Sequence, residues 1–532
     1  MSLSAADLLE LGLAAFLALL GWVSRPWVEP FCTKLARRTG WSMLVLAVLP
    51  IALRLALLAH HPAPFPVTYQ EYANLLGADT LRHFRLANPP EPLASFFETL
   101  GVLQEPTYSA VAPLGPALLL MLGWTGVLLS TAAFCALVYW MLLAWMPPLW
   151  ALSGGVLAII EFGPLNGWTN SYTGGLLAAA AGCLVFGSLP RLRASYRTRD
   201  AVLLGVGLGV VLLVQPYQYA LLLACVILFF LRPSPSVTRA VPVVILALVP
   251  AFVLMLVQNK QATGSWAMTP ATLSQLQYGV PDSLTFQAPP KPDRDLTPQQ
   301  EALYQSQLSY RDKDGESLKV FFLRLEYRAR FYRFFFLPAL YLVLPLFLAA
   351  LREYRLIWIA LSLAVFAAGI NFIAAFDLAM LAPAAGLFVL VSVVGLERLS
   401  RINREAAWLI LALCGAHFVL WYGLHVTDSS AMLRYETWRG INHPDDKAEF
   451  IATLAAAPGK QLVVVRYSER HVYQEEWVHN EADLDGAKVV WARDLGREED
   501  QKLIGAFPGR TVWVLEPDQN PPGLRKLSAS DN

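Results

Sequence analysis

The chain is dominated by long apolar runs separated by short polar stretches. The first two runs cover residues 8–23 and 41–59, and residues 106–160 contain no charged side chain. A membrane-spanning helix needs about 20 mostly apolar residues, so these lengths are typical of transmembrane segments. Pro147 and Pro148 lie between two apolar runs, where a helix can start without losing an internal hydrogen bond. The pattern predicts a mainly α-helical, polytopic transmembrane bundle of about 10–12 spans.

Basic residues between the apolar runs predict the orientation, because short basic loops stay in the cytoplasm. To keep these loops on one side, one segment within 149–189 must be broken or re-entrant, with residues 168–175 inside the protein at membrane depth. A final span over 407–425 then places the C-terminus outside. Arg54, the one charge in the second run, is expected to snorkel outward or to meet an anionic headgroup. The basic loops carry Arg25, Lys34, Arg37 and Arg38, then Arg191, Arg193, Arg197 and Arg199, then Arg352 and Arg355, and finally Arg398, Arg401 and Arg404.

Two long polar segments and a polar tail lie outside by this topology. Residues 60–111 and 258–333 form outer loops of a bundle over residues 1–425. Residues 426–532 contain the β-branched runs QLVVVRY, KVVWA and RTVWVLE, separated by helix-compatible stretches. That alternation predicts a small soluble α/β domain with a few parallel strands. It contains no glycine-rich phosphate loop and no nucleophile elbow, which favours an accessory role.

Composition narrows the class of protein further. Hydrophobic residues make up 56% of the 532 residues and charged residues only 15%, which indicates a membrane protein. A formal net charge of +1 without a basic block argues against nucleic acid as a partner. None of the five cysteines has metal or redox spacing. No cofactor is therefore expected; His471 and His479 are a weak candidate metal pair, and a divalent cation is left open.

The candidate active site is the first outer loop, over residues 68–108. It carries five acids, Glu71, Asp79, Glu91, Glu98 and Glu105, against two arginines, Arg82 and Arg85. An acidic, half-helical loop at the mouth of a membrane bundle is where a lipid-linked substrate can meet a carboxylate. A second candidate lies at residues 323–336, where arginines alternate with aromatic residues. That stretch is either an interfacial anchor or a phosphate clamp formed by Arg330 and Arg333.

The order of short motifs along the chain resembles bacterial membrane glycosyltransferases of the GT-C type. These enzymes are related to protein O-mannosyltransferases and to the aminoarabinose transferase of lipid A. The resemblance implies a GT-C bundle that transfers a sugar from a polyprenyl-phosphate donor to an envelope glycan, lipid or protein. The implied location is the periplasmic side of the bacterial inner membrane, among membrane lipids. The motifs are Gln70-Glu71, residues 74–80, Asn88-Pro89, Phe97-Glu98, Pro106-Thr107-Tyr108, residues 170–175, Asn259 with Thr263-Gly264-Ser265, residues 465–468 and Glu476-Trp477-Val478.

Such a transfer needs a carboxylate to accept the acceptor's proton and cationic or amide donors for the leaving phosphate. Glu71 is the predicted general base; the alternative is a glutamate that stabilises a helix N-terminus. Asp79 contacts the substrate or, more simply, braces the loop. The other predicted substrate-binding residues either line the cavity or form structural hydrogen bonds. They are Gln70, Tyr108, Asn170, Tyr172, Gln215, Tyr217, Gln218, Arg330 and Arg333.

Three positions depart from the pattern of these enzymes. Gln70 replaces the first acid of an acidic pair, and Gln215-Pro216-Tyr217-Gln218 stands where Arg-Pro-Tyr-Glu is frequent. Ala379-Met380 replaces a His-Tyr pair. Loss of these polar groups favours an alternative function, a catalytically degenerate relative that acts as a lipid-binding scaffold or partner subunit. A transporter is a third and weaker reading, because the two halves show no inverted repeat.

Overall fold

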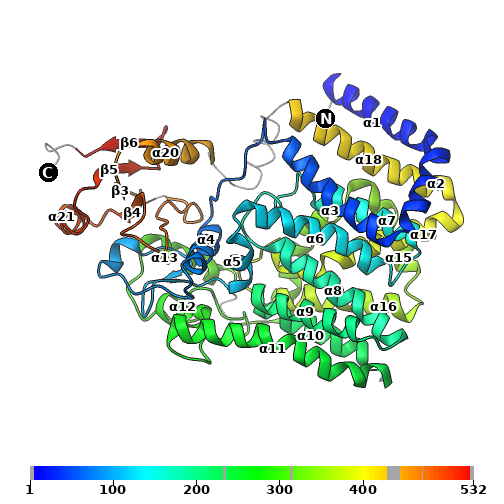
Figure 1. The fold of residues 1–532 in the computed structure, drawn as a ribbon, viewed down its shortest axis with the longest axis horizontal. Helices are drawn as coiled ribbons and strands as arrows, with labels where there is room; N and C mark the ends of the chain where they lie inside the picture. Colours follow the sequence, from blue (N-terminus) through cyan, green and yellow to red (C-terminus); the bar gives the residue numbers. More distant parts are fainter. Residues whose placement is uncertain (1–4, 232–234, 312–314, 428–443, 470, 528–532) are drawn as a thin grey trace.

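The computed structural model describes residues 5–231, 235–311, 315–427, 444–469 and 471–527. It consists of a helical bundle and a small sheet module at its end (Figure 1). By length and composition, six helical segments of the described residues can cross a membrane, or eight if each of two bent pairs counts as one span. The predicted 10–12 spans exceed this number. The remainder corresponds to apolar helices of 10–17 residues, which include α7 (Pro148–Phe162), α10 (Pro216–Phe230) and α16 (Tyr354–Ile370).

The six long segments are α3 (Thr39–Ala56), α6 (Trp124–Leu142), α8 (Gly175–Ala194), most of α11 (Pro235–Thr263), η4 (Leu378–Ala384) continued by α17 (Ala385–Ile402), and α18 (Arg404–Thr427). One bent pair is α1 (Ala5–Val23) with α2 (Arg25–Ala36), at 65°. The other, at 115°, joins α14 (Leu318–Ala329) and η2 (Arg330–Phe335) to η3 (Pro338–Leu342) and α15 (Leu344–Ala349). The apolar residues 334–351 do not form one straight helix, because Pro338 and Pro345 lie at the starts of separate short helices.

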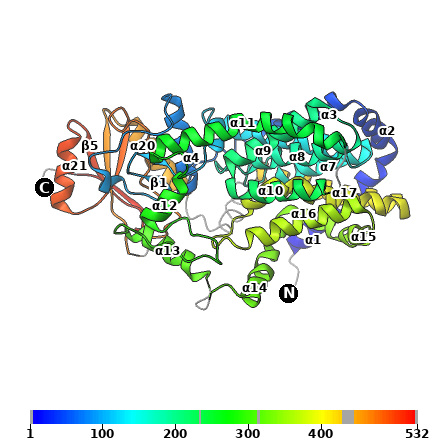
Figure 2. The same cartoon turned by 90° about the horizontal axis from the view of Figure 1, so that it is seen from below.

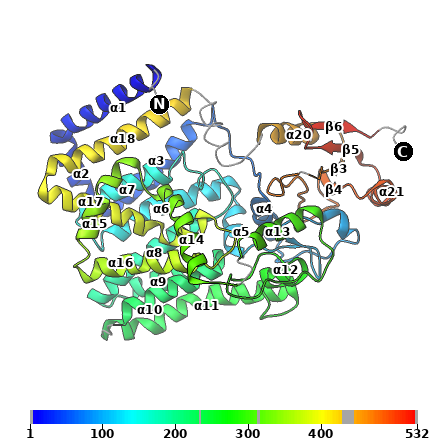
Figure 3. The ribbon, with the colours of Figure 1, turned by 180° about the vertical axis from the view of Figure 1, so that it is seen from behind.

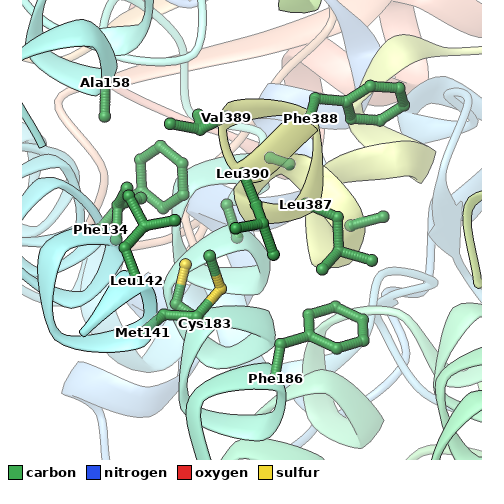
Figure 4. Packing of buried hydrophobic residues seen from close by; sticks show 14 of the residues in the cluster. Phe134, Met141, Leu142, Ala158, Cys183, Phe186, Leu387, Phe388, Val389 and Leu390 are labelled. Carbon is green, nitrogen blue, oxygen red and sulfur yellow. The ribbon is translucent and has the colours of Figure 1, made fainter. Parts of the chain in front are cut away.

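The core of the bundle lies between α6, α8 and α17. Figure 4 shows Phe134 and Met141 from α6 and Cys183 and Phe186 from α8 packing against residues 387–390 of α17. At Gly182, an added Cβ would lie 1.9 Å from the Pro383 carbonyl oxygen. Only glycine permits this close approach of α8 to η4.

Basic residues gather at one end of the bundle, where α8 and α10 end and α16 begins. Arg398 forms an ion pair with Glu353, and Arg404 forms one with Glu29. Between α9 (Thr198–Val214) and α10, the chain breaks at Gln215. The connection between α7 and α8, residues 163–174, is largely buried, as expected for a segment held inside the protein.

Most of the two polar segments lies beside the end of the bundle that faces the sheet module, whereas α14 lies against the bundle (Figure 3). The first contains α4 (Tyr69–Arg82), η1 (Ala94–Phe97) and a two-stranded ribbon of β1 (Val102–Leu103) and β2 (Ser109–Ala110), before α5 (Leu114–Leu120). The second contains α12 (Pro270–Tyr278), α13 (Pro298–Ser309) and α14. Figure 2 shows α13 and α14 on the side of the molecule opposite to α11.

The C-terminal module is a four-stranded sheet of order β4-β3-β5-β6, in which β6 alone is antiparallel to its neighbour. Leu454 of the first helix packs on the face formed by Val463, Val465 and Trp491. The opposite face packs against the second helix and also against Phe96 and Phe97 of η1. The first outer loop therefore completes the core of the module. The elements are α20 (Pro444–Ala456), β3 (Gln461–Val465), β4 (Val489–Arg493), α21 (Arg497–Ala506), β5 (Thr511–Glu516) and β6 (Gly523–Lys526).

Candidate functional site

Glu71 lies at the start of α4, where it forms a capping box with Thr68. Its Oε2 accepts hydrogen bonds of 3.0 Å from the Val67 and Thr68 amides and from the Thr68 hydroxyl. Its Oε1 accepts one of 3.0 Å from the Tyr172 amide. A carboxylate has about four lone-pair sites, so these donors occupy the group. Glu71 thus fastens α4 to the connection between α7 and α8, and its predicted role as general base requires one of these bonds to open.

Gln70 occupies the neighbouring position but faces away from the cap. Its side chain is exposed, whereas Glu71 is 6% exposed. The position at which the resembling enzymes carry their first acid is therefore the accessible one, and in this chain it holds an amide.

Asn170 and Arg54 form a buried polar contact beneath the loop. Arg54 is 2% exposed, with Nε donating to Asn170 Oδ1 at 2.8 Å. Its terminal nitrogens donate to the His61 and Pro62 carbonyls at 3.0 and 2.9 Å, and its guanidinium lies over the Trp124 ring at 4.6 Å. The expected snorkelling of Arg54 is thus wrong, because the Asn170 side chain and two carbonyl groups just after α3 bind it inside the protein.

Tyr172 is buried, and its hydroxyl donates to the Pro64 carbonyl at 2.9 Å. Its own carbonyl accepts a hydrogen bond of 2.9 Å from Asn74 of α4. Asp79 and Tyr108 instead connect the loop to the C-terminal module. Asp79 Oδ2 accepts a hydrogen bond of 2.8 Å from the amide of residue 482, and Tyr108 Oη donates to the carbonyl of residue 480 at 3.4 Å.

Behind α4, a buried cluster of titratable and aromatic side chains joins the loop to the module. Lys447 of α20 is 4% exposed; its ammonium donates to the Glu476 carbonyl and lies 4.3 Å from the Tyr72 ring centroid and 5.0 Å from that of Trp477. The Tyr72 ring stacks on His479 at 4.1 Å. We call these five residues the Lys447 cluster.

Burial shifts the protonation equilibria of the Lys447 cluster. It lowers the pKa of Lys447 to about 7, against the partial opposition of nearby carboxylates that include Glu476 and Glu71. Burial and the neighbouring Lys447 charge lower the pKa of His479 well below its usual value. The imidazole is therefore neutral at physiological pH, when the lysine is close to its titration point.

Arg493 at the end of β4 ties three segments together. Its guanidinium donates to the Glu98 carbonyl in the first outer loop and to Gln299 Oε1 in α13. It also lies 3.7 Å from the buried carboxylate of Glu476, which accepts the Tyr467 hydroxyl at 2.6 Å. In the sequence, Glu476 and Tyr467 stand out only as parts of short motifs, and no local pattern around Lys447 or Arg493 indicates that they are buried.

The predicted polar groups of α10 form contacts between helices. Gln215 donates to the Ala379 carbonyl at 2.7 Å, and Tyr217 donates to the Gly369 carbonyl at 2.7 Å. Gln218 is buried. These bonds hold α10 against η4 and α16, which is the structural alternative that the sequence left open.

The predicted phosphate clamp, Arg330 and Arg333, is exposed at the bend after α14. The Arg330 guanidinium lies 3.6 Å from the Tyr327 ring centroid. Arg324 and Arg328 are the buried arginines of this segment. Arg328 donates to the carbonyls of residues 370, 373 and 374, at 3.0, 2.7 and 2.8 Å, and so binds α14 to the end of α16.

The predicted site residues therefore fall into separate groups. Within the described ranges, no hydrogen bond or ion pair joins Glu71, Gln218 and Arg330 to one another. Nor do these ranges contain a group of three or more His, Cys, Asp or Glu side chains arranged for a metal ion.

The comparisons with known proteins support the architecture. No protein-family model and no curated protein sequence matches the chain. Its structure is similar to the crystal structure of ArnT from Cupriavidus metallidurans in the apo state, with a TM-score of 0.50 and 12% sequence identity over 90% of this chain and 93% of that chain. The fold is of the GT-C type. The predicted GT-C bundle with a C-terminal sheet module is therefore confirmed. At 12% identity the likeness establishes the fold alone and not the reaction.

Proposed function

We propose that this GT-C protein is a membrane glycosyltransferase that transfers a sugar from a polyprenyl-phosphate-linked donor to an envelope glycan, lipid or protein. The proposed location is the bacterial inner membrane, with the C-terminal module on the periplasmic side. The observation that carries the proposal is the GT-C architecture itself, which extends over 90% of the chain. The arginine-rich loops support the orientation, because they gather at the end of the bundle remote from the module.

In the proposed reaction, a carboxylate accepts the proton of the attacking hydroxyl while the sugar leaves the polyprenyl phosphate. Glu71 serves as base if its bond to the Tyr172 amide opens, and Gln70 and Asp79 lie on the same helix. The exposed Arg330 and Arg333 are the proposed donors to the leaving phosphate.

The test is release of labelled polyprenyl phosphate by the reconstituted full-length protein. Glu71→Gln is expected to abolish release. Because Glu71 also caps α4, Thr68→Val provides the matched control: it removes the hydroxyl of the same capping box and leaves the carboxylate in place. Activity lost in Glu71→Gln and kept in Thr68→Val supports a base. Equal loss in both variants, in proportion to lost stability, removes Glu71 from the proposal.

A second candidate function is that of a scaffold or partner subunit. In this case the chain is a catalytically degenerate relative of these enzymes that binds a lipid-linked sugar without transferring it. Two observations favour it: donors occupy the Glu71 carboxylate, and the accessible neighbour is Gln70. Donor lipid that binds without turnover supports this function. Release that appears in Gln70→Asp then identifies the missing acid as the cause.

A further inference from the structure

A cavity of about 480 Å³ opens at the arginine-rich end of the bundle. Its walls are the ends of α8 and α10, the start of α16 and the connection between α6 and α7. Figure 3 shows α8, α10 and α16 near one another, and α10 packs directly against α16. The aromatic and charged side chains of the wall are Trp145, Arg193, Phe229, Glu353, Tyr354 and Arg355.

Aromatic rings hold Arg193 at the wall of this cavity. Its guanidinium carbon lies 5.2 Å from the Phe229 ring centroid and 5.4 Å from that of Tyr354. One N–H donates to the Phe229 carbonyl at 3.4 Å, which is long for a hydrogen bond. A guanidinium has five N–H donors, and the described part of the chain offers Arg193 no second acceptor. The group is thus fixed in place with most of its donors uncommitted.

The charge of the cavity is positive. Glu353 is the acid in its wall, and its carboxylate forms an ion pair with Arg398 of α17. That pair neutralises the glutamate, so Arg193 and Arg355 determine the sign of the potential. Trp145 forms an apolar part of the wall and stacks on Trp358 at 5.8 Å with nearly parallel rings.

We propose that this cavity binds the phosphate headgroup of an anionic phospholipid, with Arg193 and Arg355 on the phosphate oxygens. The planar fork of arginine matches the geometry of phosphate, and aromatic rings favour the boundary between headgroups and acyl chains. Basic pockets between transmembrane helices on the cytoplasmic side bind anionic headgroups in this manner. The ends of apolar helices and the Trp145 wall favour a lipid over a soluble phosphate. The site depends on the bundle lying in a membrane, and not on the proposed transfer reaction.

The test measures binding of fluorescent phosphatidylglycerol and phosphatidylcholine to the full-length protein in detergent micelles. The protein is expected to bind phosphatidylglycerol more tightly, with affinity that falls as salt rises. Arg193→Gln and Arg355→Gln should each weaken it about tenfold, the loss expected for one charge-assisted contact. Arg193→Lys keeps the charge without the fork and should give a smaller loss. The matched control is Arg352→Gln, which removes an exposed charge from the same turn but outside the cavity and should change nothing.

Three results overturn the proposal. One is an affinity for phosphatidylglycerol that is unchanged in both Arg193→Gln and Arg355→Gln. Another is an equal loss of this affinity in Arg352→Gln, which would indicate only general attraction to a basic surface. The third is competition by inorganic phosphate at the concentration at which phosphatidylglycerol binds, which would assign the site to a soluble anion. Melting temperatures accompany each measurement. If Arg193→Gln does not fold, the exposed Arg355 decides the question.

Discussion

The buried charged side chains of this protein mainly connect one segment of the chain to another. Glu71 joins α4 to the residues before α8, Arg54 closes the end of α3, and Arg493 links three segments. Each of these groups has hydrogen-bond partners from both the backbone and other side chains. Removing one of these charged groups leaves its buried partners without a hydrogen bond, and the free energy of that loss exceeds what the bond itself contributes.

Glu71→Gln should lower the free energy of unfolding by about 2–3 kcal/mol, because an amide offers fewer lone pairs to the donors of the cap and cannot carry charge. The measurement is thermal unfolding of the purified protein. Gln70→Glu is the control, since this exposed neighbour takes no part in the cap. A melting temperature unchanged in Glu71→Gln would contradict the contacts of the carboxylate.

The lowered pKa of Lys447 makes the free energy of unfolding depend on pH. Its folded-state pKa is lowered to about 7, whereas a free lysine has a pKa of about 10.4. Between these values the unfolded chain binds more protons than the folded one, so rising pH stabilises the fold by up to about 1.4 kcal/mol per unit. Below the lower value both states are protonated and the dependence disappears.

The check compares melting temperatures of the natural protein and Lys447→Met from pH 6 to 10. The natural protein should gain stability relative to the variant only above pH 7. A difference that is flat over this range would show that Lys447 is not desolvated.

Among the helices, α14 is amphipathic in the inverse of the usual way, with polar residues buried and apolar residues exposed. Its buried positions are Arg324 and Arg328, whereas Leu318 and Phe322 are 78% and 61% exposed. A helix whose apolar residues face outward is stable where its surroundings are lipid or interfacial. Arg328 donates to three backbone carbonyls, and Arg324 donates to the Asn371 carbonyl and forms an ion pair with Glu316. The exposed apolar face fits an interfacial anchor, one of the two alternatives that the sequence left open, whereas the phosphate clamp of Arg330 and Arg333 stays a prediction.

The two faces predict different outcomes for two similar substitutions. Arg328→Ala removes donors from three carbonyls at the end of α16 and should destabilise the protein by about 2–4 kcal/mol. Arg330→Ala removes an exposed guanidinium and should leave the melting temperature unchanged. If Arg330 holds the leaving phosphate, that variant should instead weaken binding of the polyprenyl-phosphate donor. Equal effects of both substitutions on stability would contradict the assignment of the faces.

For the whole molecule, the first outer loop connects the bundle to the C-terminal module. Phe96 and Phe97 of the loop lie in one core with Leu462, Val490 and Leu503 of the module. The Asp79 and Arg493 contacts reinforce this connection from either side. A change in the module is thus expected to reach α4 and its neighbouring Gln70 and Glu71.

Phe97→Ala tests this coupling. Phe97 is 1% exposed and meets Phe507 edge to face at 6.2 Å, so truncation should cost about 3–5 kcal/mol. Amide exchange should rise both in the loop and in β3 and β4. Phe84→Ala is the control, because Phe84 is 98% exposed. Faster exchange confined to the loop would show that the module folds without it.

Much of the architecture was predictable because apolar periodicity and breaks are local properties. The apolar runs and the parallel strands of the module follow from short windows of sequence. The buried stretch before α8 followed instead from the side of the membrane on which the basic loops must lie. The number of spans was less predictable. Segments such as 334–351 are apolar enough to cross a membrane, but prolines and packing divide them into short helices.

The sequence by itself determined that this chain forms a membrane helical bundle with polar outer segments and a sheet at its end. The reason is that the free energy of placing apolar residues in lipid depends on composition over about 20 residues. It also located the acids and amides of α4. Only the tertiary structure decided which of them are available for chemistry, because the bond from the Tyr172 amide to Glu71, the contact of Asn170 with Arg54 and the burial of Arg328 and Lys447 come from distant segments that no local pattern brings together.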